Sequence, residues 1–287
     1  MMYGIDIGTT FTKVCIHKED ENDETIRFPS ILENLSVFLK NHFDGKKEIK
    51  QICVIGSGSH KYREILEKVN PTPIFADEIK INSDGILRHL QNPENYIKIG
   101  GKSLETHDKF IVAALGTGAS FSYYENQKAT HIGGTGIGGG TFLGLCKLIL
   151  GISDYPKILE LAKNGKSENV DLMISDLVGS DYISTLTANV VASSMAKAAW
   201  SEERPKDEDL ASSLLGTLAM SIGCHLAAAC TSKECNTCVL VGGFLDYGGF
   251  ISNTITSALN LFVPTVTIIV PKDSQFIGAI GAAYYGK

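Results

Sequence analysis

The most constraining feature of this sequence is a strand–turn–strand pattern, built around Gly-Thr, that occurs twice. The first copy covers residues 3–16 with its turn at Gly8, and the second covers residues 110–124 with its turn at Gly116. Short apolar runs separated by glycine-rich turns are typical of β-hairpins. The repeated hairpin predicts two α/β halves that present equivalent turns to each other across a cleft.

Hydrophobic periodicity predicts the remaining elements. Further strands are expected at residues 25–28, 51–55, 129–132, 238–241 and 266–270. Helices are expected at residues 30–43, 79–90, 141–150, 155–163, 170–177, 190–199, 210–229 and 278–285. No low-complexity linker separates the halves, and we expect their boundary within residues 92–108. This pattern predicts an α/β fold with one domain at residues 1–105 and a second at residues 106–287.

Charge and composition exclude several classes of protein. The net charge is −6, so the chain has no overall electrostatic footprint for nucleic acid. The N-terminus lacks the basic region and the apolar run of a secretory signal. Residues 211–230 contain no charged side chain, but their serines and His225 indicate a buried core helix rather than a membrane span. Seven cysteines without a signal indicate reduced thiols in a cytoplasmic protein.

The first turn has the chemistry of a phosphate site. Its glycine lets the backbone approach a ligand closely, and its amides and threonine hydroxyls can bind phosphate oxygens. Asp6 ends the preceding strand and can hold Mg²⁺, while Lys13 can reach the same phosphates. A plain hairpin with a surface aspartate is the alternative. The equivalent turn at Gly116, followed by Ser120, favours the phosphate site.

A glycine-rich run, residues 133–140, precedes the helix expected at 141–150. A helix N-terminus attracts anions, so this run is a second candidate for nucleotide binding. Its glycines match the dinucleotide-binding pattern formally. We reject that interpretation because a second helical segment follows, where the motif requires a strand ending in an acid. Gly101-Lys102-Ser103 resembles the end of a P-loop, but Tyr96 occupies the place of the required first glycine.

Two further motifs allow both a structural and a functional interpretation. Cys235 and Cys238 form a lone C-x-x-C, and no additional ligands at suitable spacing indicate a zinc site. Asp77 and Glu78 precede a helix, where acids commonly complement the helix dipole. The functional alternative for this pair is a general base beside the phosphate site.

Together these motifs resemble the type II (eukaryotic-like) pantothenate kinases, within the actin/hexokinase-like ATPase superfamily. The resemblance covers nearly the whole chain, and the run from Gly136 to Cys146 is its most specific part. The other matching segments are Asp6 to Thr10, Gly116 to Ser120, Gly165 to Asp171, Val191 to Ser194, Val241 to Phe244 and Gly278 to Ala282. The resemblance implies duplicated ribonuclease H-like domains with ATP and Mg²⁺ between them. It also implies a homodimer that phosphorylates the primary hydroxyl of pantothenate, the first step of coenzyme A synthesis.

The resemblance also implies roles for individual residues. Glu78 matches the catalytic base, because the family places a glycine seven positions later and Gly85 stands there; Asp77 is the alternative if the alignment slips by one. Asp6 matches the Mg²⁺-binding residue, and Ser120 a pantothenate contact. The expected nucleotide contacts are Asp6, Gly8, Thr9, Thr10, Lys13, Thr117, Gly139, Gly140, Thr141, Phe142, Leu143, Tyr155 and Gly242.

One position departs from the family. Where the family has an arginine that holds the substrate carboxylate, this chain has His131. Arginine is always charged and binds carboxylates in bidentate fashion, whereas histidine is mostly neutral at pH 7. Three alternatives to a pantothenate kinase stay open. They are a related kinase with another acceptor such as pantetheine, a nucleotide- or coenzyme A-binding regulator, and an ATPase activator that carries an iron–sulfur cluster.

Overall fold

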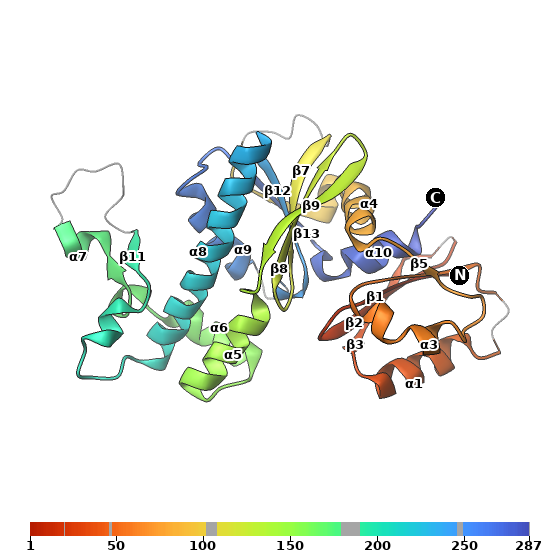
Figure 1. The fold of residues 1–287 in the computed structure, drawn as a ribbon, viewed down its shortest axis with the longest axis horizontal. Helices are drawn as coiled ribbons and strands as arrows, with labels where there is room; N and C mark the ends of the chain where they lie inside the picture. Colours follow the sequence, from red (N-terminus) through yellow and green to blue (C-terminus); the bar gives the residue numbers. More distant parts are fainter. Residues whose placement is uncertain (20, 46–47, 102–107, 179–189, 246–248, 287) are drawn as a thin grey trace.

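Two β-sheets, one for each copy of the hairpin, form the framework of the molecule (Figure 1). The computed structural model describes residues 1–19, 21–45, 48–101, 108–178, 190–245 and 249–286. The first sheet has the strand order β3-β2-β1-β4-β5, and the second has the order β6-β13-β12-β7-β8-β9. The two orders correspond when the second sheet is read in the reverse direction, as β9-β8-β7-β12-β13-β6. Its first five strands then occupy the same positions as β3-β2-β1-β4-β5 in the first sheet. The duplication expected from the two hairpins is confirmed.

The first sheet combines an antiparallel and a parallel half. β1 (Met2–Ile7) pairs antiparallel with β2 (Phe11–His17), which pairs with β3 (Glu24–Pro29). β4 (Gln51–Ile55) lies parallel to β1, and β5 (Ile74–Phe75) lies parallel to β4. α1 (Leu32–Phe43) packs its buried side chains on one face. α10 (Ile277–Ala283), although it comes from the C-terminal end of the sequence, packs on the other face.

The second sheet follows the same plan. β7 (Lys109–Leu115), β8 (Ala119–Glu125) and β9 (Lys128–Thr135) form an antiparallel meander. β12 (Thr237–Val241) lies parallel to both β7 and β13 (Thr267–Pro271), and β6 (Tyr96–Ile99) adds an antiparallel edge. The helices on one face are α5 (Gly139–Leu150), α6 (Tyr155–Asn164), α8 (Asp207–Lys233) and α9 (Phe250–Asn260).

Helices α4 (Glu78–Leu90) and α10 lie between the two sheets (Figure 1). α4 packs Ile86 and Leu90 on the second sheet, while α10 covers the first. The two helices touch through glycines: a Cβ on Gly85 would meet the Ile277 carbonyl oxygen at 2.4 Å, and one on Gly281 would meet the Ile81 carbonyl oxygen at 2.2 Å. This close approach joins the two sheets.

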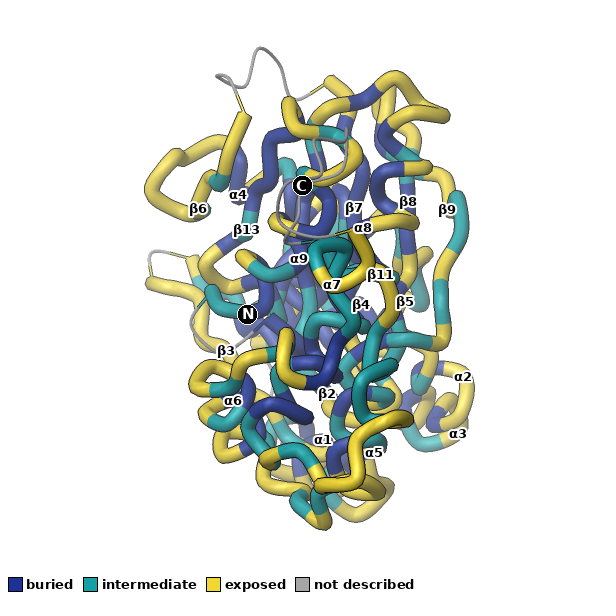
Figure 2. The backbone as a smooth tube through the Cα atoms, turned by 90° about the vertical axis from the view of Figure 1, so that its left-hand side faces the viewer, coloured by how far each residue is buried: buried dark blue, intermediate teal, exposed yellow. Residues whose placement is uncertain are grey.

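Helix α8 is the core helix expected at residues 210–229. Among the residues that the structure describes, it is the one helix long and apolar enough to cross a membrane by length and composition. It packs against α6, α9 and α5 and contributes many buried side chains to the largest apolar core. Figure 2 shows the buried backbone concentrated in the interior of the molecule, with exposed segments around it.

The helix prediction for residues 190–199 was wrong, and the one for residues 170–177 was right only from Ile174 onward. Residues 170–177 form the short strand β10 (Leu172–Met173) followed by α7 (Ile174–Val178), and residues 190–199 form β11 (Val191–Ser193) and the 3-10 turn η3 (Ala196–Ala199). The buried Asp171 carboxylate accepts hydrogen bonds from the Met195 amide and the Ser213 hydroxyl. The bond from Met195 joins the residue before β10 to the segment after β11, and the bond from Ser213 anchors this residue to α8. Together with the β10–β11 pairing, these tertiary contacts override the local helical pattern.

The sequence analysis also missed elements. Those not expected are β5, β6, α9, the short helices α2 (Gly58–Lys61) and α3 (Arg63–Leu66), and the 3-10 turns η1 (Pro93–Asn95), η2 (Ser167–Asn169), η4 (Gly243–Leu245) and η5 (Ser274–Phe276). The boundary expected between residues 105 and 106 lies outside the described residues, so the division into domains stays a prediction. β6 pairs with the second sheet, and α10 packs on the first.

A pair of helical glycines tests the contact between α4 and α10. Gly281→Ala adds a methyl group where the Ile81 carbonyl lies 2.2 Å away, whereas Gly216→Ala on α8 adds one with nothing within 4 Å. We expect Gly281→Ala to lower the free energy of unfolding by about 1–3 kcal/mol through overpacking. Gly216→Ala should change it little, or raise it by up to ~1 kcal/mol through helix propensity. Urea unfolding measures both, and equal effects would contradict the close contact.

Candidate active site

The two hairpin turns contact each other, as their equivalent places in the sheets imply. The hydroxyl oxygens of Thr10 and Thr117 lie within hydrogen-bond distance at 3.0 Å. Both threonines are exposed. The Gly8 amide bonds the Phe11 carbonyl and the Gly116 amide bonds the Gly118 carbonyl, so these two N–H groups shape the turns. The exposed hydroxyls and the remaining amides are the groups available to a ligand.

Asp6 lies beside these turns in a cradle made by two glycines. A Cβ on Gly56 would come within 2.6 Å of Asp6 Oδ1, and one on Gly278 within 3.3 Å of Asp6 Oδ2. Lys13, directly opposite on β2, forms an ion pair with Asp6 at 3.2 Å. The Asp6 carboxylate is thus held in place while the lysine ammonium stays beside the first turn. The sequence analysis named Gly278 only as the start of a segment that matches the family, and it gave neither Gly56 nor Gly278 a role in the site.

The feature that could have identified Gly56 is the strand topology rather than a sequence motif. β4 lies parallel to β1 and ends at Ile55, so Gly56 follows at the same edge as the first turn. The carboxyl ends of parallel strands meet at one edge of a sheet, where ligands commonly bind. If the parallel pairing of β4 with β1 had been predicted, the glycine directly after β4 would have been a candidate site residue.

Glu78 is the first residue of α4, and the Asp77 side chain caps the helix by accepting the Lys80 amide at 2.8 Å. Asp77 is therefore engaged as a cap, which leaves Glu78 as the candidate base. Although Glu78 is exposed at the surface, the protein atoms around its carboxyl group desolvate it and raise its pKa from the ordinary value of 4.5 to about 7. The negative charges of Asp6 and Asp77 add to this, while Lys13 opposes it. A carboxyl group that titrates near neutral pH is suited to accept a proton.

The glycine-rich run has a structural role that the sequence analysis did not anticipate. The first amides of α5, at Gly139 and Gly140, donate to the carbonyls of Gly116 and Thr117, each at 2.9 Å. A Cβ on Gly139 would lie 3.0 Å from the Gly116 carbonyl, and one on Gly140 would lie 2.6 Å from Thr117 Cγ2. These glycines let α5 dock directly on the second turn. Their expected contact with nucleotide stays a proposal.

Other expected nucleotide contacts surround this docking point. Phe142 is fully buried and packs edge-on against Tyr155 and Phe244, so its side chain belongs to the core. The Thr141 hydroxyl donates to the Gly136 carbonyl, Leu143 is half-buried, and the Tyr155 hydroxyl donates to the Phe244 carbonyl. Gly242 has a φ of +114°, and its amide donates to the Ser274 carbonyl. Their nucleotide contacts stay proposals.

The expected acceptor residues share one face of the second sheet. Ser120 and His131 are both exposed, and His131 lies opposite Ser122 across the β8–β9 pairing. Tyr124 lies four residues after Ser120 on β8, and Ala129 lies two residues before His131 on β9, so they point to the same face of the sheet as those two residues. Both pack against α4, so this is the face that α4 covers. Lys128 lies three residues from His131 with no break in register between them, so it belongs to the opposite face of the sheet.

The cysteines do not form part of this site. All seven are free thiols, in line with the expectation of reduced cysteines. Cys235 donates to the Thr237 carbonyl, and Cys230 and Cys238 place their sulfurs 3.4 Å apart in the core. The described residues contain no group of three or more His, Cys, Asp or Glu side chains that could hold a metal ion. A cation at Asp6 would therefore need ligands from a substrate.

The residues present fit Mg²⁺ held in this manner. Mg²⁺ typically keeps several waters and is bound through one or two carboxylates together with substrate phosphates. The Asp6 carboxylate, with its space kept by Gly56 and Gly278, offers such an oxygen beside the threonine hydroxyls.

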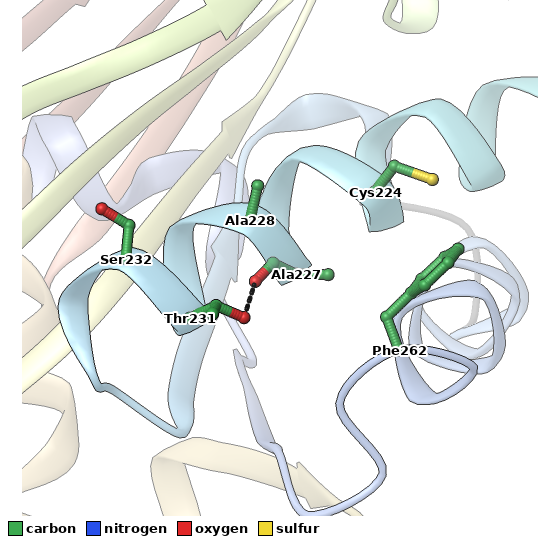
Figure 3. Close-up of a pocket in the computed structure, with 6 residues that line it drawn as sticks. All are labelled: Cys224, Ala227, Ala228, Thr231, Ser232 and Phe262. Carbon is green, nitrogen blue, oxygen red and sulfur yellow. Dashed lines mark hydrogen bonds between the residues drawn. The ribbon is translucent and has the colours of Figure 1, made fainter.

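A groove elsewhere on the surface is unrelated to these residues. It has a volume of about 470 Å³ and lies between α8 and Phe262 (Figure 3). Its lining residues are Cys224, Ala227, Ala228, Thr231, Ser232 and Phe262. None of them is among the expected site residues.

Comparisons with known proteins extend over the whole chain. The profile of a family described as Fumble matches residues 2–285. "Type II pantothenate kinase" from Bacillus cereus (strain AH820) is 26% identical over 282 residues, which cover 98% of this chain and 96% of the relative. The mouse (Mus musculus) "4'-phosphopantetheine phosphatase" is 28% identical over 268 residues, which cover 87% of this chain but 32% of that protein.

Solved structures show the same fold at low sequence identity. A ROK family glucokinase from Streptomyces griseus, in complex with glucose and AMPPNP, aligns with a TM-score of 0.60 at 12% identity, covering 98% of this chain and 97% of that chain. The ethanolamine utilization protein EutJ from Carboxydothermus hydrogenoformans aligns with a TM-score of 0.58 at 10% identity, covering 99% and 89%. The duplicated ribonuclease H-like fold of the actin-like ATPases is thereby confirmed.

The raised pKa of Glu78 makes a prediction about stability. Because the folded-state pKa of about 7 exceeds the ordinary value of 4.5, the folded state retains the proton that the unfolded state releases between these values. The wild type therefore loses stability at Glu78 as the pH rises through this window. Glu78→Gln has no group that titrates at this position. The melting temperature of the variant minus that of the wild type should therefore increase as the pH rises from 4.5 to 8.

Glu160→Gln, on an exposed part of α6, serves as the control for this experiment. It should show no such growing advantage over wild type. A difference between Glu78→Gln and wild type that does not change with pH would contradict the raised pKa.

Proposed function

The chain belongs to the Fumble family, and we propose that it is a pantothenate kinase, which transfers the γ-phosphoryl group of ATP to the primary hydroxyl of pantothenate. The product, 4'-phosphopantothenate, is the first intermediate on the route to coenzyme A. One observation carries this proposal: the two hairpin turns meet at Thr10 and Thr117 with Asp6 and Glu78 beside them. The relatives named type II pantothenate kinase, which match nearly the full chain, support the choice of acceptor.

The geometry supports a division of labour in binding ATP. Lys13 and the hydroxyls of Thr10 and Thr117 would donate hydrogen bonds to the phosphates, one hydroxyl from each turn. Asp6 would hold the Mg²⁺ ion, which when bound neutralises part of the phosphate charge. α5 fixes the second turn through Gly139 and Gly140, so the donors are positioned before ATP arrives. Phosphoryl transfer depends mostly on such positioning and on neutralising charge.

Glu78 would act on the acceptor. As the acceptor oxygen bonds to the γ-phosphorus, the bond to the leaving ADP breaks and the hydroxyl proton passes to the Glu78 carboxylate. This requires the ionised carboxylate, and a pKa of about 7 provides a substantial ionised fraction near neutral pH. The free enzyme should lose activity as the pH falls below this value.

Ser120 and His131 would bind the acceptor on the face covered by α4. Ser120 would hydrogen-bond pantothenate, and His131 would face its carboxylate where the family has arginine. Since histidine is mostly neutral at pH 7, a neutral acceptor such as pantetheine is the second candidate.

Further properties are proposed on the same basis. We propose that the protein is cytoplasmic and homodimeric, with Mg-ATP as its cofactor and no nucleic-acid or membrane partner. The net charge of −6 supports the proposed lack of a nucleic-acid partner, and the burial of α8 in the core supports the proposed lack of a membrane partner. Residues 1–105 and 106–287 are proposed as the two ribonuclease H-like domains.

The reaction is tested by measuring ADP release from Mg-ATP with no acceptor, with pantothenate and with pantetheine. We expect strong stimulation by pantothenate, and we expect Glu78→Gln to abolish it while ATP binding persists. Stimulation by pantetheine alone would move the proposal to the second candidate. Stimulation by neither, with ATP still bound, would contradict kinase activity on this class of acceptor.

His131→Arg tests the orientation of the acceptor. A bidentate, charge-assisted bond to the pantothenate carboxylate should lower KM for pantothenate by about tenfold. KM for the neutral pantetheine, measured in the same assay, should not fall and serves as the control. An unchanged or higher KM for pantothenate, or equal shifts for both acceptors, would contradict a carboxylate-facing role.

A further inference from the structure

Asn82 is a polar residue of α4 that neither the motifs nor the proposed mechanism uses. It lies four residues after Glu78, so both residues share one face of the helix. Its neighbours Ile81 and Ser83 are buried, whereas Asn82 is half-buried and reachable by solvent. The Asn82 amide therefore remains partly accessible to solvent, although its helix packs between the two sheets.

The Asn82 amide lies near the Asp6 carboxylate, next to Gly278. A Cβ on Gly278 would meet Asn82 Oδ1 at 2.8 Å and Asp6 Oδ2 at 3.3 Å, so both oxygens lie over the same glycine. Any side chain at position 278 would separate or displace the two groups. Gly278 thus keeps the Asn82 amide and the Asp6 carboxylate side by side.

The Asn82 side chain has no hydrogen-bond partner among the residues that the structure describes, whereas Asp6 has its ion pair with Lys13. A polar group facing an acidic site without a protein partner is available to a ligand or to ordered water. Two oxygen acceptors placed over one glycine are suited to receive the hydrogens of water molecules around a hard cation.

We propose that Asn82 is a positioning residue of the nucleotide site, which accepts a hydrogen bond from the hydration shell of the Mg²⁺ held by Asp6 and the nucleotide phosphates. This inference rests on the proposed binding of Mg-ATP, but it is independent of the acceptor. Outer-shell partners of a metal typically change its affinity by 10–100-fold when they are removed, because they orient the groups that hold it.

Mn²⁺ binding tests this role without turnover. Mn²⁺ is titrated into the full-length protein with a non-hydrolysable ATP analogue and no acceptor, and bound metal is measured by electron paramagnetic resonance. We expect Asn82→Ala to weaken Mn²⁺ binding by about tenfold or more. Asn82→Asp keeps an oxygen acceptor at the same place, so it should bind Mn²⁺ within about twofold of wild type or more tightly.

Ser83→Ala is the matched control on the same helix. Ser83 is buried, and its hydroxyl donates to the Ile79 carbonyl, away from the carboxylates. We expect it to bind Mn²⁺ like wild type. Analogue binding without metal should be equal in all variants, because the proposed bond exists only with the metal present.

Three results would overturn the assignment. They are wild-type Mn²⁺ affinity in Asn82→Ala, an equal loss in Asn82→Ala and Ser83→Ala, and a loss in Asn82→Asp as large as in Asn82→Ala. Failure of the wild type itself to bind Mn²⁺ with the analogue would also overturn it. A lack of pantothenate-dependent turnover would instead count against the proposed reaction and leave the Mn²⁺ comparison readable.

Discussion

The structure depends on the contact between α10 and its two neighbours, β1 and α4. This contact requires glycine on every side: Gly4 on the strand, Gly85 on α4 and Gly281 on α10 each leave no room for a Cβ. Because α10 covers the first sheet while α4 covers the second, their close approach sets how the sheets meet. It also places Glu78 beside Asp6, although the two belong to different elements. The geometry proposed for catalysis is thus a consequence of backbone packing, not of a local motif.

The two hairpin turns occupy equivalent places in their sheets, but different contacts hold them. The first turn lies at the edge of a sheet whose neighbouring strand supplies Gly56, whereas the second turn is held by the amides of α5. The glycine-rich run that resembles an anion site therefore serves first to bring a helix N-terminus onto the turn. Since those amides are already bonded, the threonine hydroxyls carry more of the proposed phosphate binding than the motif alone suggests.

The sequence predicted the hairpins, most of the helices and the duplicated α/β plan, because these follow from local periodicity and turn residues. It failed at Leu172–Met173 and at residues 190–199, where the buried Asp171 carboxylate accepts hydrogen bonds from Met195 and Ser213, which lie far away in the sequence. It proposed Asp6 and Glu78 separately as site residues, but their proximity depends on α10, which is remote in sequence. Gly56 and Asn82 belong to no motif, and Gly278 belongs to a matching segment without an assigned role. Only the tertiary packing shows that these three residues lie close to the Asp6 carboxylate.

The central claim is that the two turns form one phosphate site. Hydrogen–deuterium exchange with and without Mg²⁺ and a non-hydrolysable ATP analogue tests it most directly, followed on peptides covering residues 8–13 and 116–120. The account predicts that both peptides gain protection together, since one nucleotide would contact both turns. Protection of one turn alone, or of neither while the analogue is bound, would contradict it.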